Sequence, residues 1–165
     1  MNNLYHATPY DISASGFYFK TYEEYCKKSA AHRNEYGDPI EEYEMQFIDG
    51  DNYELFNALN VNQANLKEWF DTFEDMDTDA TIKATYLARD LGYNMANIED
   101  KLDDVILFEG TPKEYAENYI EETGLLNGLA DNLHYYFDVD AFSCDMLLSG
   151  DVTEVTIMEI DYVVL

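Results

Sequence analysis

Residues 111–124 read Thr-Pro-Lys-Glu-Tyr-Ala-Glu-Asn-Tyr-Ile-Glu-Glu-Thr-Gly, and this stretch sets the organisation of the carboxyl-terminal part of the chain. Thr111 and Glu114 have the spacing of a capping box, in which two side chains satisfy free backbone N–H groups at the start of a helix. Pro112 is favoured at the first helical position, and Gly124 is a typical residue for ending a helix. The sequence therefore predicts a helix that begins after Thr111 and ends at Gly124.

The segments around this helix predict a small α+β domain over residues 105–165. A strand is indicated at residues 105–108, which read Val-Ile-Leu-Phe. Beyond Gly124, the expected elements are helices at about residues 129–137 and 141–148 and a closing hairpin of residues 152–160 and 162–165.

The rest of the chain predicts two further domains. The first domain consists of three strands and a helix. The strands are expected at about residues 4–8, 16–19 and 43–48, and the helix from Thr21 to about Glu35. In the second domain, large apolar residues recur at three- and four-residue spacing, which predicts a cluster of short helices. We therefore expect the fold class α+β, as a chain of three small domains (α+β, helical, α+β) with the boundaries 1–52, 53–104 and 105–165.

The charge balance excludes several functions. The 165 residues include 35 Asp and Glu but only 9 Lys and Arg, a formal net charge of −26. Binding to DNA or RNA requires a basic surface, which nine scattered cations cannot supply, and an anionic membrane is disfavoured for the same reason. Because 47% of the residues are hydrophobic, we expect a folded protein rather than a disordered one. We expect it in the cytoplasm, with Cys26 and Cys144 as reduced thiols.

No catalytic or metal-binding motif stands out. Residues 75–80 resemble the first half of a calcium-binding loop, but Ala80 takes the place of the required glycine and Tyr86 that of the terminal glutamate. We interpret this segment as a connection between helices, with Asp79 as the N-cap. Three dispersed histidines do not suggest a zinc site; they are His6, His32 and His134. We therefore predict no catalytic residue, no metal and no cofactor.

Acidic side chains on the predicted helices are the most specific feature of the sequence. Glu114, Glu117 and Glu121 lie on one helix face, although like charges at this spacing destabilise a helix by roughly 0.2–0.5 kcal/mol per pair. Residues 114–165 hold twelve acids and no Lys or Arg. One such row is usually a solvated face, but repeated rows favour a surface in which carboxylates imitate phosphates. The candidate residues are Asp71, Glu74, Asp75, Asp77, Asp79, Glu99, Asp100, Asp103, Asp104, Glu114, Glu117, Glu121 and Glu122.

The size of the charge predicts an extended arrangement of the domains. Two chains would carry as much charge as about 26 base pairs of duplex, or roughly 88 Å of its axis. A compact domain of this length has a radius of gyration of only about 15 Å. Matching the charge density of DNA therefore requires an elongated chain.

Several segments resemble the ArdA antirestriction proteins. The most specific are Tyr-Ile-Glu-Glu-Thr-Gly at residues 119–124 and Leu-Ser-Gly-Asp-Val at residues 148–152. Residues 133–138 lie at a family-like distance between them, and residues 43–49 are similar to an acidic strand of the family. The resemblance is strongest over the last third of the chain.

The resemblance implies a non-enzymatic, dimeric, elongated DNA mimic that occupies the DNA-binding groove of type I restriction–modification enzymes and protects mobile DNA entering a host. It also points to the third domain for dimerisation. The residues that could supply an apolar interface there are Leu125, Leu126, Leu129, Tyr135, Tyr136 and Phe137.

The residues alone leave two other classes open. An acidic module could bind basic DNA-binding proteins in general, without a restriction enzyme as its target. A hydrolase could use two of the many carboxylates as acid and base, although the sequence does not single out a pair.

Overall fold

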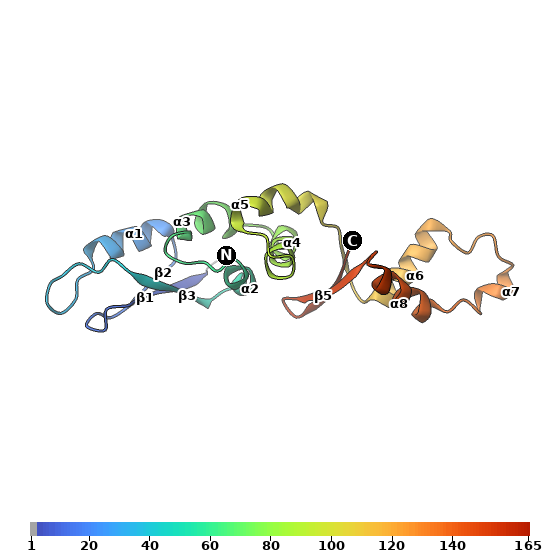
Figure 1. The fold of residues 1–165 in the computed structure, drawn as a ribbon, viewed down its shortest axis with the longest axis horizontal. Helices are drawn as coiled ribbons and strands as arrows, with labels where there is room; N and C mark the ends of the chain where they lie inside the picture. Colours follow the sequence, from blue (N-terminus) through green and yellow to red (C-terminus); the bar gives the residue numbers. More distant parts are fainter. Residues whose placement is uncertain (1–2) are drawn as a thin grey trace. The chain divides into compact units, whose positions relative to one another are not determined.

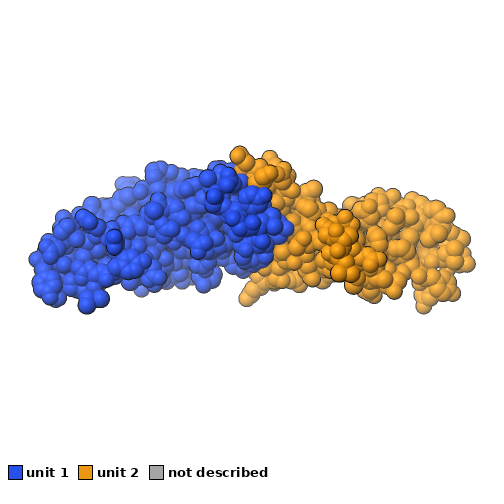
Figure 2. Space-filling view, viewed as in Figure 1, with its two compact units in different colours: residues 1–99 blue, residues 100–165 orange. Residues whose placement is uncertain are grey.

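The computed structural model describes residues 3–165. Over these residues the protein has a mixed α+β structure, with eight α-helices and two three-stranded antiparallel sheets (Figure 1). The chain divides into two compact units, unit 1 (residues 1–99) and unit 2 (residues 100–165), which Figure 2 shows in different colours.

The sheet of unit 1 has the strand order β2-β1-β3. Its strands are β1 (Leu4–Pro9), β2 (Phe17–Phe19) and β3 (Tyr43–Asp49). Tyr5 in the central strand lies opposite Phe19 on one side and Phe47 on the other. Alternate side chains of a strand point to opposite faces, so Tyr5, Ala7 and Met45 are buried on one face of the sheet. The three predicted strands are confirmed.

Helix α1 (Tyr22–Ala31) follows the sheet's second strand and begins where the sequence predicts. The hydroxyl of its N-cap, Thr21, accepts a hydrogen bond of 3.1 Å from the backbone N–H of Glu24. The helix ends before the predicted Glu35, because His32 takes an extended conformation. The imidazole Nδ1 of His32 lies 2.9 Å from the hydroxyl of Tyr43, which ties the end of the helix to β3.

The helical part of unit 1 confirms the prediction of short helices. Its elements are α2 (Tyr53–Ala58), α3 (Leu66–Glu68), the π-helical turn η1 (Trp69–Phe73), α4 (Thr78–Arg89), α5 (Met95–Ile98) and the start of the 3-10 turn η2 (Glu99–Asp104). The π-helical turn closes when the backbone N–H of Glu74 donates to the carbonyl of Trp69 over 2.9 Å. This five-residue spacing brings Trp69 and Glu74 to the same side of the turn.

The core of unit 1 joins the sheet to the helices. The ring of Tyr5 packs against Phe56 of α2 at 5.7 Å and against Phe70 of η1 at 5.2 Å between ring centroids. Trp69 and Phe73 are fully buried in the same core. Residues of the predicted domains 1–52 and 53–104 therefore share one core, and the boundary between those domains stays a prediction.

The sheet of unit 2 has the strand order β4-β6-β5, with β4 (Leu107–Glu109), β5 (Thr153–Ile157) and β6 (Ile160–Val164). The closing hairpin is confirmed, but its turn lies earlier than predicted. Met158 and Glu159 form this turn with positive φ angles of 53° and 64°. Two-residue hairpins favour such angles, which are usually supplied by Asn or Gly, so the sequence gives no signal for a turn here.

The helices of unit 2 are α6 (Pro112–Thr123), α7 (Asp131–His134) and α8 (Val139–Ser149). The capping box at Thr111 and Glu114 is confirmed, and Gly124 ends α6 in the left-handed conformation with φ of 62°. The helix predicted over residues 129–137 is reduced to the single turn α7. None of the residues of this turn is buried, so no packing stabilises a longer helix there.

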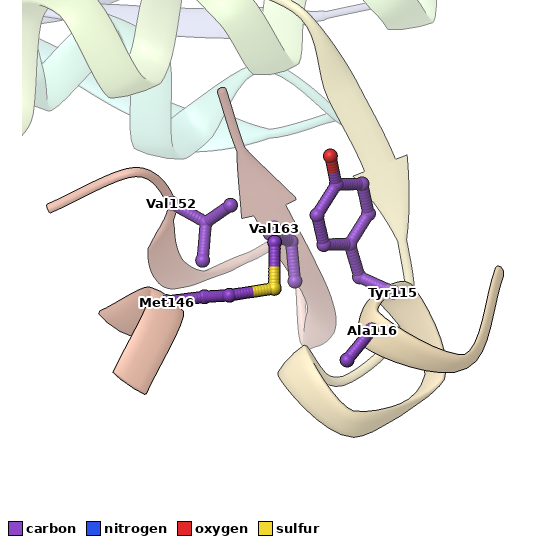
Figure 3. Packing of buried hydrophobic residues seen from close by; sticks show 5 residues of the cluster. All are labelled: Tyr115, Ala116, Met146, Val152 and Val163. Carbon is purple, nitrogen blue, oxygen red and sulfur yellow. The ribbon is translucent and has the colours of Figure 1, made fainter. Parts of the chain in front are cut away.

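The core of unit 2 lies between α6, α8 and the sheet. Figure 3 shows five buried residues of one cluster in this core: Tyr115 and Ala116 of α6, Met146 of α8, Val163 of β6, and Val152. Ala116 and Val163 are fully buried. This packing fixes the buried sides of α6 and α8, so their opposite sides face solvent.

Candidate functional site: the exposed acids

Helix α6 presents the predicted row of carboxylates to solvent. Glu117, Glu121 and Glu122 are all exposed. Glu114, at the start of the row, accepts hydrogen bonds of 2.8 Å from both the backbone N–H and the hydroxyl of Thr111. These two bonds, the backbone one first, hold the pKa of Glu114 below its usual range. Glu114 thus caps the helix and also places negative charge at the positive end of the helix dipole.

The last cation of the sequence is already paired. The Lys113 ammonium lies 2.9 Å from a carboxylate oxygen of Asp140 in α8, and this interaction raises the pKa of Lys113. After Lys113 the chain has twelve acids and no Lys or Arg. Lys113 also interacts with Glu117 and is the single Lys or Arg of α6, so the acids of this helix outnumber its cation.

The turn η2 carries a second group of candidates. Glu99, Asp100, Asp103 and Asp104 are all exposed. Asp104 pairs with Lys101, whose Nζ lies 2.7 Å from the carboxylate.

Four candidates from η1 and the start of α4 are exposed as well. Asp71 forms an ion pair with Lys67, and Asp79 forms an ion pair of 2.8 Å with Lys83. In both pairs the two residues are four positions apart in the sequence. Asp77 and Asp75 are also exposed. The interpretation of Asp79 as N-cap of α4 is wrong: the side chain of Asp77 accepts a hydrogen bond of 2.8 Å from the backbone N–H of Ala80 and caps the helix.

Glu74 differs from the other candidates because it is buried, with 9% of its surface exposed. Its carboxylate accepts a hydrogen bond of 3.2 Å from the Asn3 side-chain amide, and the Tyr5 hydroxyl lies 3.5 Å from the same oxygen. The prediction that Glu74 is exposed is therefore wrong. The π-helical turn places this side chain in the interior of unit 1. The other twelve candidates are called the exposed acids below.

Sequence reasoning passed over three acids on α8. Asp138, Asp140 and Asp145 are exposed, and Asp138 caps the helix by accepting a hydrogen bond of 2.9 Å from Ala141. They are two and five residues apart, unlike the three- and four-residue spacing of the acids on α6, so a search for helical spacing does not single them out.

Most Lys and Arg side chains form ion pairs within the protein. Over residues 3–165, six of the nine Lys and Arg residues form ion pairs with Asp or Glu: Lys28, Lys67, Lys83, Arg89, Lys101 and Lys113. Unit 1 has a formal net charge of −12 and unit 2 one of −14. Both units therefore present a large excess of negative charge.

Two cavities, both in unit 1, contain no pair of carboxylates. The first has a volume of about 390 Å³, and Glu68 is the one acidic residue that lines it. The second has a volume of about 260 Å³, and Glu44 is the one acidic residue that lines it. Hydrolysis by two carboxylates requires both groups in one site. Within the described part of the chain, no three His, Cys, Asp or Glu side chains are placed to hold a metal ion.

The three histidines have structural contacts. His6 packs on the ring of Tyr18 at 4.6 Å between ring centroids, His32 contacts Tyr43, and the His134 ring lies 3.3 Å from the carbonyl of Leu129. They lie in separate places of the fold.

The candidate interface residues of unit 2 are mostly exposed. Tyr135 and Tyr136 expose 89% and 78% of their surface, and Leu125 and Leu129 expose 47% and 44%. Leu126 and Phe137 are half-buried, and Phe137 packs against Phe142 with 5.6 Å between ring centroids. The segment between α6 and α8 therefore holds apolar surface that unit 2 does not cover.

The comparisons with known proteins identify the family. A comparison with curated proteins found no match. The model of the ArdA antirestriction protein family matches residues 10–159, which is most of the chain. Across the described residues, every helix is too short or too polar to cross a membrane. The resemblance noted in the sequence is thus confirmed, and the chain belongs to the ArdA family of antirestriction proteins, which are inhibitors without enzymatic activity.

Proposed function

We propose that this antirestriction protein acts as a DNA mimic, and that its exposed acids occupy the positions of phosphates in the DNA-binding groove of a type I restriction–modification enzyme. The observation that carries this proposal is the exposure of twelve of the thirteen candidate acids. A groove that binds DNA is lined with Lys and Arg, and these cations attract carboxylates as they attract phosphates. Both proteins would meet inside the host cell.

The summed charge, rather than any single residue, supplies the affinity in this proposal. An exposed charge pair contributes little by itself, but several potentials of the same sign add along a groove. Glu117, Glu121 and Glu122 are the strongest contributors, because none of them forms an ion pair within the described residues. Asp71, Asp79 and Asp104 contribute less, since each already pairs with a lysine.

Dimerisation and an elongated three-domain arrangement complete the proposal. The exposed tyrosines and leucines between α6 and α8 support an interface in unit 2, because apolar patches of this kind often mark contacts between proteins. Two copies would double the length of negative surface available to the enzyme. Sedimentation at several protein concentrations tests this part, and a monomer at micromolar concentration would count against it.

The decisive experiment is displacement of a fluorescent DNA duplex from a type I methyltransferase core. We expect displacement at low salt and a steep loss of it as salt rises, because screening weakens every contact. A protein that fails to compete at low salt would contradict the proposal. Equal binding to unrelated basic DNA-binding proteins would favour the alternative of a general acidic interaction module.

Matched variants separate local contacts from net charge. The triple variant Glu117→Gln, Glu121→Gln, Glu122→Gln removes three exposed acids of α6. The control Glu35→Gln, Glu41→Gln, Glu42→Gln removes three exposed acids outside the candidate set and changes the net charge equally. We expect the α6 variant to lose more competition than the control, and equal losses would assign the effect to net charge alone.

A further inference from the structure

The larger cavity of unit 1 is formed by three stretches that lie apart in the sequence, and it is called the Glu68 pocket below. Leu59 and Asn60 follow α2, Asn65 and Glu68 begin and end the turn of α3, and residues 92–96 follow α4. Its volume of about 390 Å³ lies in the lower part of the range of about 300–1,000 Å³ that is usual for ligand pockets. The pocket is therefore large enough to receive one long side chain of a partner.

Backbone hydrogen bonds hold the walls of the Glu68 pocket in place. Asn60 takes a left-handed conformation with φ of 49°, and its carbonyl accepts a hydrogen bond of 3.0 Å from the Asn62 side-chain amide. After α4, Gly92 reverses the chain with φ of 74°, and the backbone N–H of Tyr93 donates to the carbonyl of Leu87 over 2.9 Å. The pocket is thus formed by the fold itself, before any partner binds.

The lining of the Glu68 pocket combines apolar side chains, an aromatic ring and one carboxylate. Leu59 and Met95 are each 7% exposed, Tyr93 is half-buried, and Glu68 is exposed. A long basic side chain has the matching parts, because its methylene groups pack on apolar surface while its charged end stays with polar groups. The lining therefore fits a cationic side chain better than a wholly apolar ligand.

The cations of the protein leave the Glu68 pocket unneutralised. No Lys or Arg is among the described residues that line it. Lys67, the neighbour of Glu68 in the sequence, pairs instead with Asp71, and this hydrogen bond raises the pKa of Lys67. Glu68 forms no ion pair with another described residue. Its carboxylate is therefore available to a cation from outside the chain.

The charge of unit 1 selects the same kind of occupant. Its formal net charge of −12 attracts cationic groups and repels anionic ligands. Asp71, one of the exposed acids, follows Glu68 by three residues, so the pocket lies close in the chain to the acids that the proposed function assigns to a basic groove. A basic side chain of such a groove would meet the pocket as the two proteins associate.

We propose that the Glu68 pocket receives one arginine side chain from the DNA-binding groove of the restriction–modification enzyme. This inference rests on the proposed function and adds to it one specific anchor among the many weak charge contacts. The methylene groups of the arginine pack on Leu59 and Met95, and its guanidinium group meets the Glu68 carboxylate and the Tyr93 ring. A guanidinium suits this lining because it is planar, pairs with carboxylates through two N–H groups and stacks on aromatic rings.

A nuclear magnetic resonance titration of the whole protein with Nα-acetyl-arginine methylamide tests the pocket directly. We expect the signals of Tyr93 and the Met95 methyl group to shift with this probe. The corresponding citrulline derivative has the same length and no charge, and should produce little shift. Glu68→Gln should lose the response to arginine. The control Glu44→Gln removes the same charge from the smaller cavity and should keep it.

A variant that fills the pocket tests its role in binding the enzyme. Ala96 of α5 lines the pocket and is exposed, so Ala96→Phe occupies the space without changing the charge. We expect this variant to displace DNA from the methyltransferase core about tenfold less well than the wild type, as for the loss of one anchor residue. Ala31→Phe adds the same ring at an exposed position at the end of α1, and should compete like the wild type.

Three results would overturn the inference. They are arginine-induced shifts that spread over the exposed acids without a maximum at the pocket, an equal response to citrulline, and equal competition by Ala96→Phe and Ala31→Phe. A wild type that displaces DNA but does not bind the arginine probe would refute the pocket and leave the proposed function intact. A wild type that binds the probe at the pocket but fails to displace DNA would contradict the proposed function and still support recognition of arginine.

Discussion

The Trp69 indole donates a hydrogen bond of 2.9 Å to the hydroxyl oxygen of Tyr5, 64 residues earlier in the chain. Both side chains are fully buried. A buried indole N–H needs an acceptor, because it has left the water that bound it in the unfolded chain. The first strand and the π-helical turn therefore depend on each other for both packing and hydrogen bonding.

Tyr5→Phe should destabilise the protein by about 1–3 kcal/mol, because it leaves the Trp69 N–H without its acceptor. Urea unfolding followed by circular dichroism measures this difference. The control Tyr18→Phe removes a hydroxyl from a ring that is 55% exposed, and should change the free energy of unfolding little. Equal effects of the two variants would mean that the Trp69 bond adds nothing.

Gly124→Ala should destabilise unit 2 by about 1–2 kcal/mol, because residue 124 has a left-handed conformation with φ of 62° that alanine disfavours. An added Cβ would also lie 2.3 Å from the Asn127 side chain. Gly128→Ala provides the matched control, since a Cβ there meets nothing within 4 Å. A loss of stability in both variants alike would contradict the assigned helix end.

Glu114→Gln should weaken the start of α6 at neutral pH but not in acid. The pKa of Glu114 is lowered in the folded protein, so the group contributes stability above its unfolded pKa and loses it as pH falls through the folded pKa. Thermal melts between pH 3 and 7 should show the wild type above the variant only in the upper part of this range. Glu117→Gln changes the charge equally without touching the cap, and a similar pH-dependent loss there would refute the assignment.

Moderate salt should raise the melting temperature of the wild type. The net charge of −26 makes the folded protein repel itself, and added ions screen that repulsion. Melts at low ionic strength and at about 0.15 M NaCl test this, with sucrose of equal osmolality as a control for non-ionic effects. A melting temperature that falls with salt would show that the ion pairs matter more than the repulsion.

Local signals account for the parts of the fold that the sequence predicts well. Thr111, Pro112 and Gly124 determine the ends of α6 through interactions within a few residues, so the helix could be read directly. The apolar spacing of Leu66, Trp69 and Phe73 correctly indicates a helix, but it cannot distinguish a π-helical turn from an α-helix.

Two of the wrong predictions depend on interactions between residues that lie far apart in the sequence. The burial of Glu74 depends on Asn3 and Tyr5, which precede it by 71 and 69 residues, so its own neighbourhood in the sequence gives no warning. The early end of α1 depends in the same way on the contact between His32 and Tyr43. Exposure of the other candidate acids was predictable because charged side chains rarely leave water without a partner.

The uncovered side chains between α6 and α8 have a consequence for the solubility of the protein. Tyr135 and Tyr136 lie in a segment with acidic neighbours, and β4 and β5 are the edge strands of the sheet of unit 2. Edge strands and exposed aromatic rings favour aggregation, and electrostatic repulsion between the molecules opposes it. Near the isoelectric point of about 4.1 that repulsion vanishes, so the same molecule that disperses freely at neutral pH should precipitate in mild acid.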